Sequence, residues 1–210
     1  MYETAVLGTI IMMIVSAADY IRRAWARTIH PVPATWILAV VMFALSFWMY
    51  WVSPRRSWTA NIAVTAGLAN TTAILIGVIA ANVRYGTLRV AFGPVQRWCL
   101  AFGAAVVAFW WITDAPLVAY ALVQVIGIAA YVATVPKLWN ARGSTEPLFV
   151  WVSILLATLC AIYPAWTKHD PFSWIYLVRA VPSTTLMVFL IARANRRMRH
   201  DASPAASLRA

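Results

Sequence analysis

The chain has 210 residues, of which 63% are hydrophobic and only 11% are charged. Soluble domains are about half apolar and roughly a quarter charged, so this composition excludes a soluble globular fold and predicts an all-α integral membrane protein. The net charge of +11 does not indicate a nucleic-acid partner, because the basic residues fall in short gaps between long apolar runs. Cys99 and Cys160 both lie inside apolar runs, which excludes an extracellular disulfide scaffold.

Seven apolar runs are long enough to cross a bilayer core, which needs roughly 17 to 25 residues per helix. We therefore expect transmembrane helices at 4–21, 33–52, 58–83, 95–113, 116–135, 147–165 and 172–192. Pro33 and Pro147 can open the second and sixth helices, since the first helical turn tolerates a missing N–H. A break at Asp114 separates the fourth helix from the fifth. Beyond Arg193 the chain is Arg-rich and then rich in Ser, Ala and Pro, which predicts a basic, disordered tail at 198–210.

The basic residues indicate how the chain is oriented. With the N-terminus outside, seven helices place 13 Lys and Arg residues on the inner side and 3 on the outer side. The positive-inside rule favours this arrangement. We therefore expect a multi-pass protein of the cell (inner) membrane, with its N-terminus outside and its C-terminus in the cytoplasm.

The two halves of the chain repeat one another. Tryptophans recur at a nearly constant spacing of 114 to 116 residues: Trp25 and Trp139, Trp36 and Trp151, Trp51 and Trp166, Trp58 and Trp174. The pair Thr71-Thr72 recurs as Thr184-Thr185 at a spacing of 113. Interfacial tryptophan belts alone are the alternative explanation. The repeat predicts two parallel three-helix bundles, at 1–92 and 115–197, joined by a linker transmembrane helix at 93–114.

An arrangement of three helices, one linker helix and three helices resembles the SWEET and PQ-loop superfamily of small-solute transporters. The stretch 131–144, in which Pro136 and Lys137 precede a Gly143-Ser144 turn, looks like the family signature that ends the fifth helix. The matching stretch of the first repeat, 18–25, lacks the proline. The resemblance implies alternating access around a site between the two bundles, with Pro136 as a hinge.

The resemblance also implies residues that bind the substrate. It places Asn70 and Ser183 in the cavity, midway along the third and seventh helices, with Trp51 and Trp166 near the outer ends of the second and sixth. A carboxamide suits a hydroxyl-rich ligand, and an indole face stacks on a sugar. As the alternative, Asn70 holds neighbouring helices together and the tryptophans belong to the interfacial belt.

Arg179 is the one basic residue that the orientation does not explain. It lies about two turns into the seventh helix, roughly 10 Å from its outer end. It either binds an anionic or carbonyl-bearing solute in the cavity or extends outward to the lipid headgroups. Pro182 should kink the same helix, and Gln124 of the fifth helix could also reach the cavity. Asp19 either pairs with the arginines one turn further on or gates the inner side.

The sequence contains no pattern for a metal, a cofactor or a catalytic group. The histidines His30, His169 and His200 lack the spacing of metal ligands. The chain's two lysines, Lys137 and Lys168, both lie in loops, which excludes a retinal protein that needs a Schiff-base lysine in its last helix.

We therefore expect a transporter, not an enzyme, that moves a small, largely uncharged polar solute such as a sugar by facilitated diffusion. One alternative is a carrier of the vitamin or nucleoside type, for a molecule like nicotinamide riboside. Another is a non-transporting membrane scaffold or sensor whose basic tail binds acidic lipids. The expected partners are the solute and the lipid bilayer, with no nucleic acid, and a homo-oligomer remains open.

Overall fold

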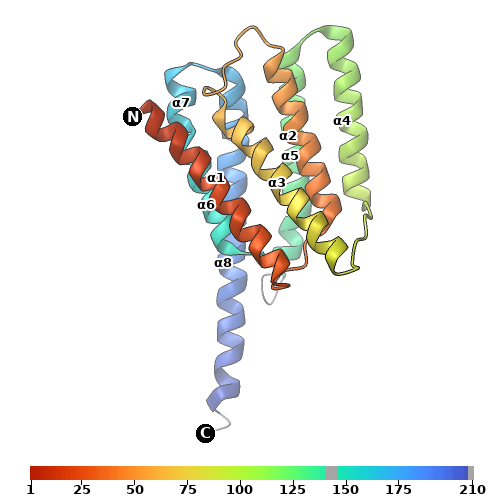
Figure 1. Cartoon of the computed structure of the whole chain (residues 1–210), viewed down its shortest axis with the longest axis vertical. Helices are drawn as coiled ribbons and strands as arrows, with labels where there is room; N and C mark the ends of the chain where they lie inside the picture. Colours follow the sequence, from red (N-terminus) through yellow and green to blue (C-terminus); the bar gives the residue numbers. More distant parts are fainter. Residues whose placement is uncertain (141–145, 208–210) are drawn as a thin grey trace.

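The protein is all-helical in the part of the chain that the structure, a computed structural model, describes, residues 1–140 and 146–207. Successive helices run up and down a single bundle (Figure 1). In chain order they are α1 (Tyr2–Trp25), α2 (Pro33–Trp51), α3 (Ile62–Arg84), α4 (Pro94–Thr113), α5 (Pro116–Trp139), α6 (Leu148–Cys160), α7 (Ile162–Thr167) and α8 (Pro171–Ser207). We call the end of the bundle that holds the N-terminus the N-side and the opposite end the C-side.

The helices are long and apolar enough for a membrane. Among the described residues, α1, α2, α3, α4, α8 and the combined run Leu148–Thr167 each meet the length and hydropathy of a membrane span, and α5 adds the shorter apolar segment Pro116–Ala129. Large apolar side chains also face outward, as at Trp111, which is 83% exposed, and Ile112, which is 85% exposed. Such an exterior is suited to lipid and not to water. These features indicate a multi-pass membrane protein.

The packing of the helices brings the two halves of the chain together. α3 lies between α1 and α2, and α8 lies between α5 and α6. The two sets meet where α1 packs on α6 and where α2 packs on α5, and α3 contacts α8 between them. α4 packs on α5 and α2 at one edge of the bundle (Figure 1). Helices of both halves therefore form the interior of the bundle.

Small residues allow the central helix α3 to approach its neighbours. A Cβ atom on Gly67 would lie 2.4 Å from the Phe43 ring of α2, and one on Gly77 would lie 2.6 Å from Ile21 of α1. Close helix contact through small residues is the usual way that membrane helices gain packing energy, since lipid tails are as apolar as the helices themselves.

Most helix boundaries agree with the expectation, and the break between the fourth and fifth helices is confirmed. Asp114 adopts a left-handed conformation with φ of 48° between Thr113 and Pro116. The third helix begins at Ile62, four residues later than expected, because residues 58–61 form turns.

The expected sixth helix is divided at Ala161 into α6 and α7. Pro164 lacks the N–H group that would bind the carbonyl of Cys160, which explains a break at this point. At the C-side, α8 continues as a helix to Ser207, through most of the tail that the sequence predicts to be disordered. The predicted Gly143-Ser144 turn and residues 208–210 lie outside the described residues.

Candidate functional site

A buried polar cluster lies where α2, α5 and α8 meet. Arg179 of α8 donates to Oε1 of Gln124 in α5 through Nε (3.3 Å) and through Nη2 (3.0 Å). The Nε2 group of Gln124 donates to the Oγ atom of Ser46 in α2 at 3.0 Å. All three residues are buried. We call these three side chains the central cluster.

Aromatic and small residues surround the Arg179 guanidinium. Its Cζ atom lies 4.9 Å from the centre of the Tyr176 ring, one turn earlier in α8. The hydroxyl group of Tyr131 in α5 also interacts with the guanidinium. Gly127 of α5 leaves room for it, since a Cβ atom there would lie 3.2 Å from Cζ and Nη1. The guanidinium is thus held by an amide, two tyrosines and the bare backbone of α5.

The central cluster contains a positive charge and no carboxylate. In the described part of the chain the ion pairs join Asp19 to Arg22 and to Arg23, and neither involves Arg179. The Arg179 side chain points to the interior and does not extend outward to the headgroups, as its contact with Gln124 requires. A buried charge without a partner costs several kcal/mol, and intramembrane charges usually serve a function.

Asn70 lies in the middle of α3, and its amide is buried. Its Oδ1 atom is buried and has no hydrogen-bond partner among the described residues. An amide oxygen in an apolar interior is unfavourable unless it is hydrogen-bonded. This atom is therefore available to a ligand or to an altered packing of the helices, and substrate binding by Asn70 stays a prediction.

The structure places the two predicted tryptophans away from the central cluster. Trp51 is the last residue of α2 and packs against Phe47 and Trp58, with centroid distances of 5.8 and 4.5 Å. Trp166 is 63% exposed in α7 and contacts Trp174. Both lie at the N-side, a position that substrate binding and an interfacial belt both predict, so their role stays a prediction.

The other predicted residues lie on α8, α5 and α1. Ser183 is half-buried in α8, one turn from Arg179, while Pro182 and Pro136 are exposed positions within α8 and α5. Asp19 accepts hydrogen bonds from Arg22 and from Arg23, each at 2.7 Å. Asp19 therefore has the partners that the simpler of its two interpretations predicts.

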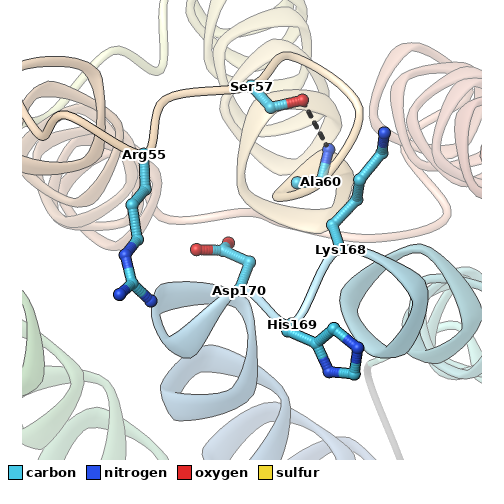
Figure 2. A pocket seen from close by; sticks show the side chains of 6 residues that line it. All are labelled: Arg55, Ser57, Ala60, Lys168, His169 and Asp170. Carbon is cyan, nitrogen blue, oxygen red and sulfur yellow. Dashed lines mark hydrogen bonds between the residues drawn. The ribbon is translucent and has the colours of Figure 1, made fainter.

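A second polar region, which the sequence analysis did not single out, lies at the N-side. A cavity of about 270 Å³ is lined by residues of the loop after α2 and of the loop before α8: Arg55, Ser57, Ala60, Lys168, His169 and Asp170. Figure 2 shows the Asp170 carboxylate pointing between Arg55 and the loop at Ser57 and Ala60, while the His169 ring points away.

Asp170 is buried in the wall of this cavity. Burial raises the pKa of its carboxyl group, although hydrogen bonds from Ser173 and Phe172 and the charge of Arg55 act in the opposite direction. The Oδ2 atom accepts from Ser173, and Oδ1 has no partner among the described residues. The signal in the sequence is a lone acid directly before a proline that begins a helix, a position suited to an N-cap.

Buried polar residues continue from this cavity toward the central cluster. The Ser173 hydroxyl donates to the carbonyl of Ala60 at 2.9 Å, which links the start of α8 to the loop before α3. Asn61 donates to the Tyr120 hydroxyl at 3.2 Å, and Tyr120 interacts electrostatically with both Asp170 and Arg179. Polar side chains thus lead from the N-side surface to the buried Asn61 and Tyr120 inside the bundle.

The described residues include no group of three or more side chains suited to a metal ion. Comparison with models of known protein families, with curated proteins and with solved structures found no match to this chain. The function is therefore argued from the site and the fold alone.

Proposed function

We propose that the chain is a membrane transporter that moves a small polar solute by alternating access between two three-helix bundles. The bundles are α1–α3 and α5–α8, joined by the linker helix α4, in the arrangement of the SWEET and PQ-loop superfamily. The observation that carries the proposal is the central cluster, because a polar site in the middle of an apolar helix bundle is what a solute pathway requires.

The helix contacts support the two-bundle arrangement. A two-fold axis along the bundle would exchange α1 with α5, α2 with the α6–α7 run, and α3 with α8. Under that exchange the contact of α1 with α6 becomes the contact of α5 with α2, and both contacts are present. The contacts within each bundle correspond in the same way, with α3 and α8 each in the middle.

Two details recur in both halves. Thr71 donates to the carbonyls three and four residues earlier, at 3.2 and 2.9 Å, and Thr184 does the same at 3.2 and 2.7 Å. The tryptophan that ends the first helix of each half lies beneath an arginine of the third: Arg84 over Trp25 and Arg193 over Trp139. Belts of interfacial tryptophan do not explain shared partners, so these pairs favour a true repeat.

The charge at the centre breaks this symmetry. The spacing of the threonine pairs places Ala66 of α3 opposite Arg179 of α8, and Ala66 belongs to an apolar cluster with Met13 and Ala157. At this position the second half of the repeat therefore has a charged residue, Arg179, and the first half has an apolar one, Ala66. Such an asymmetry suits a solute with one polar end and one less polar end.

The test is solute uptake by the full-length protein in proteoliposomes. We expect time-dependent uptake of small polar solutes that protein-free liposomes do not show, and its loss in Asn70→Ala at an almost unchanged melting temperature. The matched control is Asn82→Ala, which removes an asparagine of the same helix whose amide donates to the carbonyl of Val78. Equal uptake by both variants would remove Asn70 from the site, and absence of uptake by the wild type would contradict transport.

A further inference from the structure

The inference concerns the class of solute, and it rests on the proposed function. In the central cluster, Nε and Nη2 of Arg179 both donate to one oxygen, Oε1 of Gln124. These two nitrogens form one edge of the guanidinium, and this edge binds a carboxylate or phosphate through two parallel hydrogen bonds. In this protein a neutral amide oxygen occupies the place that an anionic oxygen would fill.

The position of the amide is fixed from its other side. Gln124 donates through Nε2 to Ser46 at 3.0 Å, so its oxygen faces Arg179. The guanidinium lies opposite this oxygen, where it contacts the Tyr176 ring and fits beside Gly127, which has no side chain. The edge of the guanidinium is thus presented in a fixed direction, toward the interface of α2, α5 and α8.

Among the described residues no acid forms an ion pair with Arg179. The six acidic residues of the chain are Glu3, Asp19, Asp114, Glu146, Asp170 and Asp201. None lies within α2, α3 or α5, and within α8 Asp201 is 22 residues beyond Arg179. Asp170 is nine residues before Arg179, at the opposite end of the polar residues described above, and its carboxylate is bound to Ser173. A solute that carries the counter-charge would give Arg179 the pairing that intramembrane charges usually have.

We propose that the transported solute has a single anionic group, a carboxylate or a phosphate monoester, which binds the Nε–Nη2 edge of Arg179 in place of Gln124 Oε1. Gln124 then donates to the solute or retains Ser46 as its acceptor. The rest of the solute is polar or hydroxylated and faces α3, where Asn70 has an unpartnered oxygen. The sequence alone predicts a largely uncharged solute, and this inference adds one negative charge to it.

The central experiment is Gln124→Glu, which changes the side chain by one group and keeps its size. The new carboxylate would pair with Arg179 and supply the counter-charge from within the protein. We expect a higher melting temperature at pH 7.5 than in the wild type. We also expect a loss of anion uptake of about 100-fold or more, because the anionic group of the solute no longer has Arg179 as its partner. Arg179→Gln should also lose anion uptake, because it removes the group that binds the anion.

Three probes separate the possible classes of solute: glucose, gluconate and glucose 6-phosphate, which are neutral, a carboxylate and a phosphate ester on similar carbon chains. The inference is supported if gluconate or glucose 6-phosphate is taken up by the wild type, or stabilises it thermally, and if Gln124→Glu removes this effect. The probe that acts identifies the anionic group. Uptake of glucose alone, unchanged in Gln124→Glu, overturns the inference and leaves the proposed transport function intact.

The melting temperatures give a result that does not depend on the probes. A Gln124→Glu variant that melts at or below the wild-type temperature would show that Arg179 does not need a counter-charge, and this would overturn the inference. If the wild type takes up none of the three probes, the proposed function is contradicted, and the melting temperatures still test the charge of Arg179 separately.

Discussion

The position of the Arg179 guanidinium depends on a residue that has no side chain. A Cβ atom on Gly127 would lie 3.1 Å from the Sδ atom of Met42 and 3.2 Å from Cζ and Nη1 of Arg179. Both distances are shorter than comfortable contacts in a packed interior, so either the sulfur or the guanidinium would have to move. Gly127 therefore sets how closely α5 approaches the central cluster.

We expect Gly127→Ala to lower the free energy of unfolding by about 1–3 kcal/mol, as overpacking does, and to reduce solute uptake because Arg179 is displaced from Gln124. Gly103→Ala in α4 is the matched control, since its Cβ atom would meet only two methyl groups at 3.6 Å. That change should be neutral or stabilising by up to about 1 kcal/mol, as alanine is the better helix former. Thermal unfolding in detergent and uptake in liposomes measure both variants, and equal effects of the two would contradict this role of Gly127.

At the scale of single residues, the sequence showed which side chains are chemically unusual but not which of them contact one another. Arg179 and Gln124 stand out in a sequence because a charge and an amide are rare inside apolar runs. Their contact could not be predicted, since it depends on how α5 and α8 rotate about their axes. Ser46 was hidden for the same reason, because small hydroxyl groups are common in membrane helices and gain significance only from their partners.

At the scale of the elements, the stability of the start of α8 should depend on pH. Asp170 precedes the helix and accepts a hydrogen bond from the backbone N–H of Ser173 at 3.1 Å, as an N-cap residue does. Burial raises the pKa of Asp170. A raised carboxyl pKa means that the folded protein holds the proton more tightly than the unfolded chain. The contribution of this group to stability is therefore greatest at low pH and is lost as the pH rises through the folded pKa.

Asp170→Asn retains a capping side chain but cannot ionise. We expect the wild type to lose melting temperature relative to this variant as the pH rises from about 4, near the pKa of a carboxyl group in the unfolded chain, to neutral pH. A series of melting curves for both proteins in one detergent measures the difference and cancels the titration of other groups. If the melting temperature of the wild type instead rises relative to that of the variant as the pH rises, Arg55 and its neighbours stabilise the carboxylate more than burial destabilises it.

The helices themselves could be located from the sequence because the length of an apolar run and the bilayer thickness are tightly linked. Their ends were harder to locate. The delayed start of α3 at Ile62 depends on contacts of the preceding loop, such as Ser57 with the Tyr50 hydroxyl at 2.8 Å. The break at Ala161 follows from Pro164, a signal that was present in the sequence but lay inside an apolar run.

At the scale of the whole molecule, the distribution of charge distinguishes the two ends of the bundle. The N-side loops contain Arg55, Arg56 and Lys168, whereas α1 and α3 end at the C-side with Arg22, Arg23 and Arg84 in their last turns. α8, which also contains arginines near its end, extends beyond the other helices there (Figure 1). The positive-inside rule predicts that the C-side faces the cytoplasm. The N-side cavity at Asp170 would then face outward, so that a solute arriving from outside meets Arg55 and Lys168 before it reaches the buried polar residues beneath.

This orientation can be tested with single cysteines in a Cys99→Ala, Cys160→Ala background. Lys168→Cys places a thiol in the wall of the N-side cavity, and Arg196→Cys places one at an exposed position near the C-side end of α8. We expect a membrane-impermeant maleimide to label Lys168→Cys in intact cells and Arg196→Cys only after permeabilisation. The opposite pattern would place the basic end outside, against the 13 to 3 distribution of charge. The Asp170 cavity would then be the cytoplasmic mouth of the pathway, and an anionic solute would meet Arg55 and Lys168 on leaving the cell.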